Sequence, residues 1–152
     1  MQYNYNHIFL ENRQISNTFA IRWSCFTAMV IGIAWIFTLF HIISVPALAF
    51  QIIAPVSIFI LLLPAVVNHL MHLSDILLVG SKGINLLTGL ILGCNLTAVF
   101  LLSSTLSHYA SIIWLLSTLI ACQYYSKRIT SHIFLGGFIG MILSFYVSIY
   151  LG

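Results

Sequence analysis

Residues 58–63 read Ile-Phe-Ile-Leu-Leu-Leu, an unbroken apolar run inside the longer apolar range 46–67. A membrane-spanning β-strand alternates apolar and polar residues, and this run does not alternate. A backbone surrounded by hydrocarbon must satisfy its own polar groups, which an α-helix does within one segment. The run therefore predicts a transmembrane helix rather than a strand.

The composition extends this prediction to the whole chain. Of its 152 residues, 61% are hydrophobic and only 5% are charged. A soluble domain carries about 25% charged residues. Because so few charges cannot cover a water-facing surface, the surface must meet lipid or a large partner. The formal net charge of +3 is too small for the clustered basic face of a nucleic-acid-binding protein, so no nucleic-acid partner is expected.

Five ranges contain the roughly 20 mostly apolar residues that a membrane-crossing helix needs. They are 23–44, 46–67, 84–106, 108–125 and 129–151. We therefore expect an all-α bundle of five transmembrane helices, forming a single domain over 23–152. A polar N-terminal segment, 1–22, precedes it and either lies on the membrane surface or is a disordered tail. Pro55 and Pro64 should kink the second helix, because proline interrupts the helical hydrogen bonds.

The basic residues predict the orientation of this bundle. With five spans, they all fall on one side of the membrane: Arg13, Arg22, Lys82, Lys127 and Arg128. The positive-inside rule then places the N-terminus in the cytoplasm and the C-terminus outside. We expect a bacterial inner membrane protein. Its first residues lack the basic and apolar regions of a cleavable signal.

Small residues indicate how the helices pack. Gly89 and Gly93 form one GxxxG pair, and Gly136 and Gly140 form another. Such spacing lets two helix backbones approach closely, either within one chain or between copies. The three cysteines, Cys25, Cys94 and Cys122, lie in apolar runs without CxxC spacing, and we interpret them as small packing residues.

Two groups of histidines are candidate metal or haem ligands. His69, His72 and Asp75 lie at i, i+3 and i+6, so a continuing helix would place them roughly on one face. They would then either bind a divalent metal or form the polar end of an interfacial helix. His41 and His108 would either hold a haem between two helices or be solvated near the interface. No cofactor is expected overall.

The entrance to the last apolar range carries a second candidate pattern. Residues 127–132 read Lys-Arg-Ile-Thr-Ser-His, and Gly136, Gly137 and Gly140 follow. Cations bind phosphate oxygens, hydroxyls donate to them, and histidine can attack phosphorus. The alternative interpretation is a basic helix end followed by packing glycines.

Residues 128–132, Arg-Ile-Thr-Ser-His, resemble the middle motif of the membrane-embedded type-2 phosphatidic acid phosphatases, which reads roughly K-I-S-x-H in a short bacterial branch. Upstream, Leu63-Pro64-Ala65, Ser74-Asp75 and Lys82-Gly83-Ile84-Asn85 follow in the order of that branch. The resemblance covers residues 63–152. It implies that Lys82 and Arg128 bind phosphate and that His132 takes part in catalysis.

The chain departs from this family in several places. The first basic motif is reduced to Lys82, and Asn85 replaces its proline. The glycines after His132 are shifted by about one position. In the family a further motif with the nucleophilic histidine follows two more spans, whereas one span follows here. Family active sites also face away from the cytoplasm, and the charge pattern places His132 inside.

The leading functional hypothesis is a non-catalytic subunit or accessory of a membrane assembly. Its expected partners are the lipid bilayer and other membrane subunits or further copies of the chain. One alternative is a reduced or degenerate lipid or isoprenoid phosphatase that uses Lys82, Arg128 and His132. Another is a small solute or ion carrier, supported by the kinked second span and by Asn85 and Asn95.

Overall fold

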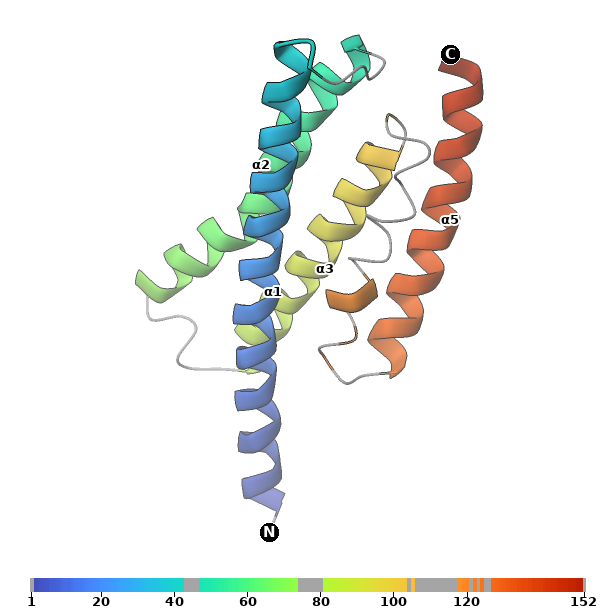
Figure 1. The fold of residues 1–152 in the computed structure, drawn as a ribbon. Helices are drawn as coiled ribbons and strands as arrows, with labels where there is room; N and C mark the ends of the chain where they lie inside the picture. The colour runs from blue at the N-terminus through green and yellow to red at the C-terminus, as the bar shows by residue number, and fades with distance from the viewer. Residues whose placement is uncertain are drawn as a thin grey trace.

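The computed structural model describes residues 2–42, 47–73, 81–103, 105, 118–120, 122, 124 and 127–151. Its main helices are α1 (Gln2–Leu39), α2 (Ala47–Leu73), α3 (Ser81–Ser103) and α5 (Lys127–Leu151), shown in Figure 1. All regular secondary structure in the described residues is helical, which confirms the predicted all-α class.

Three helical segments of the described chain are long and apolar enough to cross a membrane: Leu10–Leu39, Ala49–His72 and Lys82–Ser103. They correspond to the first three predicted spans. The fourth predicted span, 108–125, lies mostly outside the described residues. α5 coincides with the fifth predicted range and begins two residues before it. A total of five crossings remains a prediction.

α1 is one helix across the boundary that we predicted between residues 22 and 23. It ends in a hydrogen-bonded turn that satisfies two of its last carbonyl groups. The backbone N–H of His41 donates to the oxygen of Thr38 at 3.1 Å, and that of Ile42 donates to the oxygen of Phe37 at 2.9 Å. This pairing is a Schellman motif, whose left-handed position is usually a glycine. Here His41 occupies it, with φ of 55°.

α2 continues as one helix through Pro55 and Pro64. Figure 1 shows it changing direction along its course, as expected for a helix with two internal prolines. Its buried side chains follow a spacing of three and four residues, which places them on one face. They are Phe50, Ala54, Ser57, Leu61 and Pro64.

The helices pack side by side around α3, which contacts α1, α2 and α5. α1, α3 and α5 run in one direction and α2 runs back, so the first residues of α1, α3 and α5 lie at the same end of the bundle (Figure 1). We call this the basic end, because Lys82, Lys127 and Arg128 begin α3 and α5 there.

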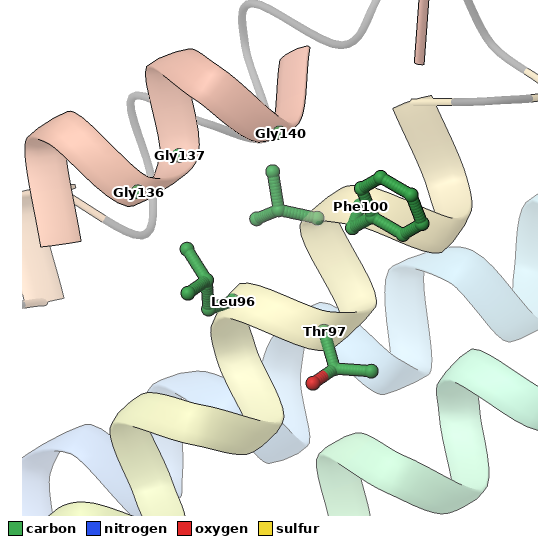
Figure 2. A pocket seen from close by; sticks show the side chains of 7 residues that line it. Leu96, Thr97, Phe100, Gly136, Gly137 and Gly140 are labelled. Atoms are coloured by element: carbon green, nitrogen blue, oxygen red, sulfur yellow. The ribbon is translucent and has the colours of Figure 1, made fainter. Parts of the chain in front are cut away.

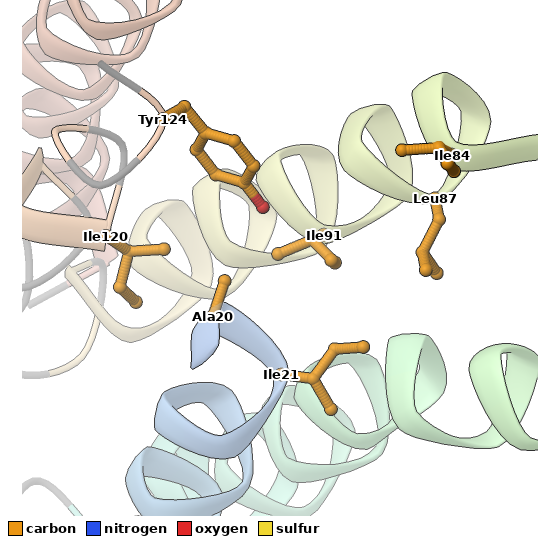
Figure 3. Close-up of a cluster of buried hydrophobic side chains, with 7 residues drawn as sticks. All are labelled: Ala20, Ile21, Ile84, Leu87, Ile91, Ile120 and Tyr124. Carbon is orange, nitrogen blue, oxygen red and sulfur yellow. The ribbon is translucent and has the colours of Figure 1, made fainter. Parts of the chain in front are cut away.

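Two clusters of buried apolar side chains lie along this bundle. The cluster nearer the basic end joins α1 and α3 to residues 120 and 124 (Figure 3): Ala20, Ile21, Ile84, Leu87, Ile91, Ile120 and Tyr124. The second joins α1, α2 and α3: Ala28, Ile31, Phe50, Ala54, Leu61, Ala98 and Leu102. The buried polar groups of the bundle lie beside these clusters.

Candidate functional site: a polar seam between α1 and α3

Two buried polar residues on α1 face two on α3. Asn17 and Ser24 are seven residues apart, and so are Thr88 and Asn95. Seven residues make about two helical turns, so each pair lies on one face of its helix. Because α1 and α3 run in the same direction, the two pairs meet in matching order. All four side chains are at most 6% exposed, and we call this contact the polar seam.

In the half of the seam nearer the basic end, Asn17 makes three hydrogen bonds to other parts of the chain. Its Nδ2 donates to the backbone oxygen of Ile84 at 3.3 Å. Its Oδ1 accepts from the Thr88 hydroxyl at 3.0 Å and from the Tyr124 hydroxyl at 2.9 Å. The Thr88 hydroxyl also lies 2.8 Å from the oxygen of Ile84, one turn earlier on α3. One carboxamide therefore joins α1, α3 and residue 124.

The other half of the seam is a direct contact between two side chains. Nδ2 of Asn95 donates to Oγ of Ser24 at 2.9 Å and to the backbone oxygen of Ile91 at 2.8 Å. The Ser24 hydroxyl in turn donates to the oxygen of Ala20 at 2.9 Å. Each side chain thus bonds both to its own helix and across the interface.

A charged contact extends the seam toward the basic end. Nη1 of Arg13 on α1 donates to Oδ1 of Asn85 on α3. Asn85 is exposed and Arg13 is partly exposed. Lys82 precedes Asn85 by three residues, so it lies one turn closer to the start of α3. The seam therefore runs from solvent-accessible cations into a neutral, buried interior.

No buried side-chain nitrogen or oxygen atom of the seam lacks a hydrogen-bond partner. Among the described residues, two buried side-chain atoms lack a hydrogen-bond partner, Nε1 of Trp35 and Oγ of Ser57. Both belong to the α1 and α2 side of the bundle and neither belongs to the seam. The seam itself consists of carboxamides and hydroxyls that bond to one another and to backbone oxygens. Chemically, it can join helices, and it presents no carboxylate, imidazole or thiol.

Of the phosphatase-like residues, the side chains of Lys82 and His132 are described, and these two do not lie together. Lys82 is exposed at the start of α3, and His132 is exposed in the first turns of α5. α5 touches α3 where Gly136 meets Leu96. Lys82 precedes that contact by fourteen residues and His132 by four, which puts them about 15 Å apart along the two helix axes. Arg128 lies one turn before His132, and its side chain is outside the described part of the chain.

Each of the two histidine groups has one member outside the described residues. His69 and His72 are exposed near the end of α2, and Asp75 is outside the described residues. No group of three or more His, Cys, Asp or Glu side chains that could hold a metal occurs in the described part of the chain. His41 is exposed in the turn after α1, and its suggested haem partner, His108, is outside the described ranges.

The two glycine pairs have different surroundings. A Cβ built on Gly136 would lie 3.4 Å from Leu96, and one on Gly140 would lie 3.6 Å from Phe100. These glycines therefore let α5 approach α3, and a hollow of about 220 Å³ remains between the helices (Figure 2). A Cβ on Gly89 or Gly93 would meet no described atom within 4 Å.

Most of the seam was not predicted from the sequence. Asn95 was singled out, with Asn85 beside the seam, whereas Asn17, Ser24 and Thr88 were not. The available signal was the repeated spacing of seven residues between polar side chains on two apolar helices. Comparison with protein families, with curated proteins and with solved structures found no match to this chain.

Proposed function

We propose that this chain is a multi-pass membrane protein that serves as a non-catalytic subunit or accessory of a membrane assembly. The observation that carries this proposal is the closed polar seam. A substrate site needs donors and acceptors directed toward the substrate. In the seam, the carboxamides and hydroxyls are directed toward the neighbouring helix instead.

The energetics of a membrane favour the same interpretation. Lipid tails are as apolar as leucine, so burial of apolar side chains gives two helices little reason to associate. Interhelical hydrogen bonds and close packing at small residues supply that reason. The chain uses both, with the seam between α1 and α3 and the contact of Gly136 with Leu96 between α3 and α5. Its described polar interior acts as a structural joint.

The outer surface suits lipid or other helices. Large apolar side chains are exposed along the helices, for example Met29 on α1, Phe59 on α2, Leu86 on α3 and Leu143 on α5. A chain whose exposed surface is this apolar contacts lipid, a partner subunit or both. We infer that partner subunits cover part of it.

The test is purification from the native membrane in a mild detergent, followed by mass spectrometry of the co-purifying proteins. The proposal expects one or more stoichiometric partners that are retained when His132 is changed to Ala. A phosphatase assay on the same preparation provides the opposing result. A lone protein that hydrolyses a lipid phosphate, and loses this activity in His132→Ala but not in the neighbouring Ser131→Ala variant, would overturn the proposal.

A further inference from the structure

α1 carries an aromatic and cationic patch on the side opposite the seam. Phe19, Arg22, Trp23 and Phe26 line a shallow hollow of about 310 Å³. At about 100° per residue, Phe26 lies roughly half a turn around α1 from Asn17, so the hollow faces away from the bundle. The rings are 37–55% exposed. We call these four residues the α1 patch.

The rings of the α1 patch form a contiguous surface. The centroids of Phe19 and Trp23 are 6.0 Å apart with the rings tilted, and those of Trp23 and Phe26 are 5.7 Å apart in an edge-to-face arrangement. The edge-to-face pair of Trp23 and Phe26 attracts beyond simple burial, which favours this arrangement. Arg22 is one turn from Phe19 and from Phe26, and its side chain is exposed among them.

The depth of the patch follows from the length of α1. Its apolar segment Leu10–Leu39 has 30 residues, about 45 Å of helix, whereas the hydrocarbon layer is about 30 Å thick. If Leu39 marks one boundary, the opposite boundary lies about 20 residues earlier, near Ala20. Arg22 is then within about 3 Å of that boundary. Helical side chains lean toward the N-terminus, so its guanidinium reaches the headgroup layer.

Arg22 has no carboxylate of its own chain within reach among the described residues. The chain contains two acidic residues, Glu11 and Asp75. Glu11 precedes Arg22 by eleven residues on the same helix, which is about 16 Å along the axis. Asp75 is outside the described residues. The positive charge of Arg22 therefore faces the lipid headgroups without a described intramolecular counter-charge.

We propose that the α1 patch binds an anionic glycerophospholipid from the surrounding leaflet. The planar guanidinium of Arg22 donates two hydrogen bonds to the phosphate, which is its preferred geometry. The indole of Trp23 lies at the level of the glycerol, because tryptophan rings are enriched at membrane interfaces. The edges of Phe19 and Phe26 contact the first acyl segments. The negative net charge of the lipid, rather than its phosphate alone, selects it over a zwitterionic one.

The test uses Trp23 as a reporter inside the patch. The chain has three tryptophans, so Trp35→Phe and Trp114→Phe leave Trp23 as the sole tryptophan, whose fluorescence is excited selectively over that of the tyrosines. This protein is reconstituted in vesicles of phosphatidylcholine that contain either brominated phosphatidylglycerol or brominated phosphatidylcholine, whose bromine atoms quench a nearby indole. The proposal predicts an affinity for the anionic lipid about fivefold above that for the zwitterionic one, as expected for one charge at the surface.

Two substitutions separate this site from general attraction to a basic protein. Arg22→Gln should bring the two affinities together. Lys82→Gln removes the same charge from an exposed position on α3 and should leave the preference intact. Equal quenching by both lipids in the parent, or equal effects of the two substitutions, would overturn the proposal.

A second measurement covers the case in which the tryptophan substitutions disturb the fold. Native mass spectrometry of the otherwise unaltered chain, released from mixed phosphatidylglycerol and phosphatidylcholine, should show a retained phosphatidylglycerol that Arg22→Gln loses. Retention that is unchanged in Arg22→Gln contradicts the proposal. So does an Arg22→Gln variant that loses a co-purifying protein while its lipids stay the same, because Arg22 would then pair with an acidic partner subunit.

Discussion

The carboxamide of Asn95 on α3 donates a 2.9 Å hydrogen bond to the hydroxyl of Ser24 on α1, and both side chains are buried. Each residue also bonds to a backbone oxygen one turn earlier on its own helix. The contact therefore links two helices that are each locally satisfied. Its loss should weaken the contact between α1 and α3. It should leave no buried hydroxyl without a partner, because Ser24 keeps its hydrogen bond to the backbone oxygen of Ala20.

Replacing Asn95 by Leu should destabilise the bundle by about 1 kcal/mol, the usual strength of an interhelical hydrogen bond in a membrane. Unfolding by denaturant in detergent micelles measures the change. Ser57→Ala is the matched control, since it removes a buried hydroxyl that has no partner. It should be neutral or slightly stabilising. A control variant as unstable as Asn95→Leu would contradict this account of the seam.

Asn17 should be more costly to replace, because its Oδ1 accepts from both Thr88 and Tyr124. We expect Asn17→Leu to cost about 2 kcal/mol and Tyr124→Phe about 1 kcal/mol. Because the two side chains share one hydrogen bond, the double variant should cost less than the sum of the two. The same unfolding measurement gives the coupling, and strictly additive costs would show that Tyr124 and Asn17 do not interact.

Bulk at Gly136 should separate α5 from α3. The nearest atom of Leu96 is 3.4 Å from an added Cβ, so alanine is close to the limit and leucine exceeds it. Gly136→Leu should cost about 1–3 kcal/mol, as overpacking does elsewhere. Gly93→Leu makes the same change where no described atom lies within 4 Å, and it should have little effect. Thermal unfolding in detergent compares the two, and equal losses would exclude close packing at Gly136 as the cause.

The helical class and the three helices long enough and apolar enough to cross a membrane were predictable, since a helix satisfies the backbone polar groups of an apolar run within one segment. The interior contacts were not. Sequence gives the spacing of Asn17 and Ser24 along α1, but the partners on α3 depend on how the two helices are aligned. That alignment is a tertiary property, and no local pattern around Thr88 determines it.

The phosphatase resemblance illustrates the same limit. It depends on Lys82, Arg128 and His132 meeting in space, and sequence order alone cannot establish such a meeting. The contact between Gly136 and Leu96 determines how α5 lies along α3, and it leaves Lys82 and His132 about 15 Å apart along the helix axes. Gly136 and Gly140, which follow His132, lie against Leu96 and Phe100 of α3, as predicted for packing glycines.

His41→Gly should stabilise the protein. His41 has a φ of 55° at the left-handed position of the turn that ends α1. A side chain there costs about 1 kcal/mol relative to glycine, because its Cβ crowds the backbone. The exposed imidazole offers no buried contact in compensation. Thermal unfolding should show a rise for His41→Gly, and no rise for His41→Ala, which keeps the Cβ.

The number of membrane crossings can be settled with single cysteines in a variant that lacks the three native ones. Four exposed positions suit this test. Three lie near the start of a helix segment, namely Asn12, Lys82 and Ser131, and the fourth, His41, lies just after the end of α1. A membrane-impermeant maleimide applied to intact cells should label a cysteine at 41.

Cysteines at 12, 82 and 131 should react only after lysis, because α1, α3 and α5 begin at the same end and we expect that end to face the cytoplasm. The position at 131 decides the matter once 41 is labelled from outside and 12 and 82 are protected. Protection at 131 then requires residues 104–126 to cross the membrane between α3 and α5, whereas labelling at 131 from outside would reject the five-span topology.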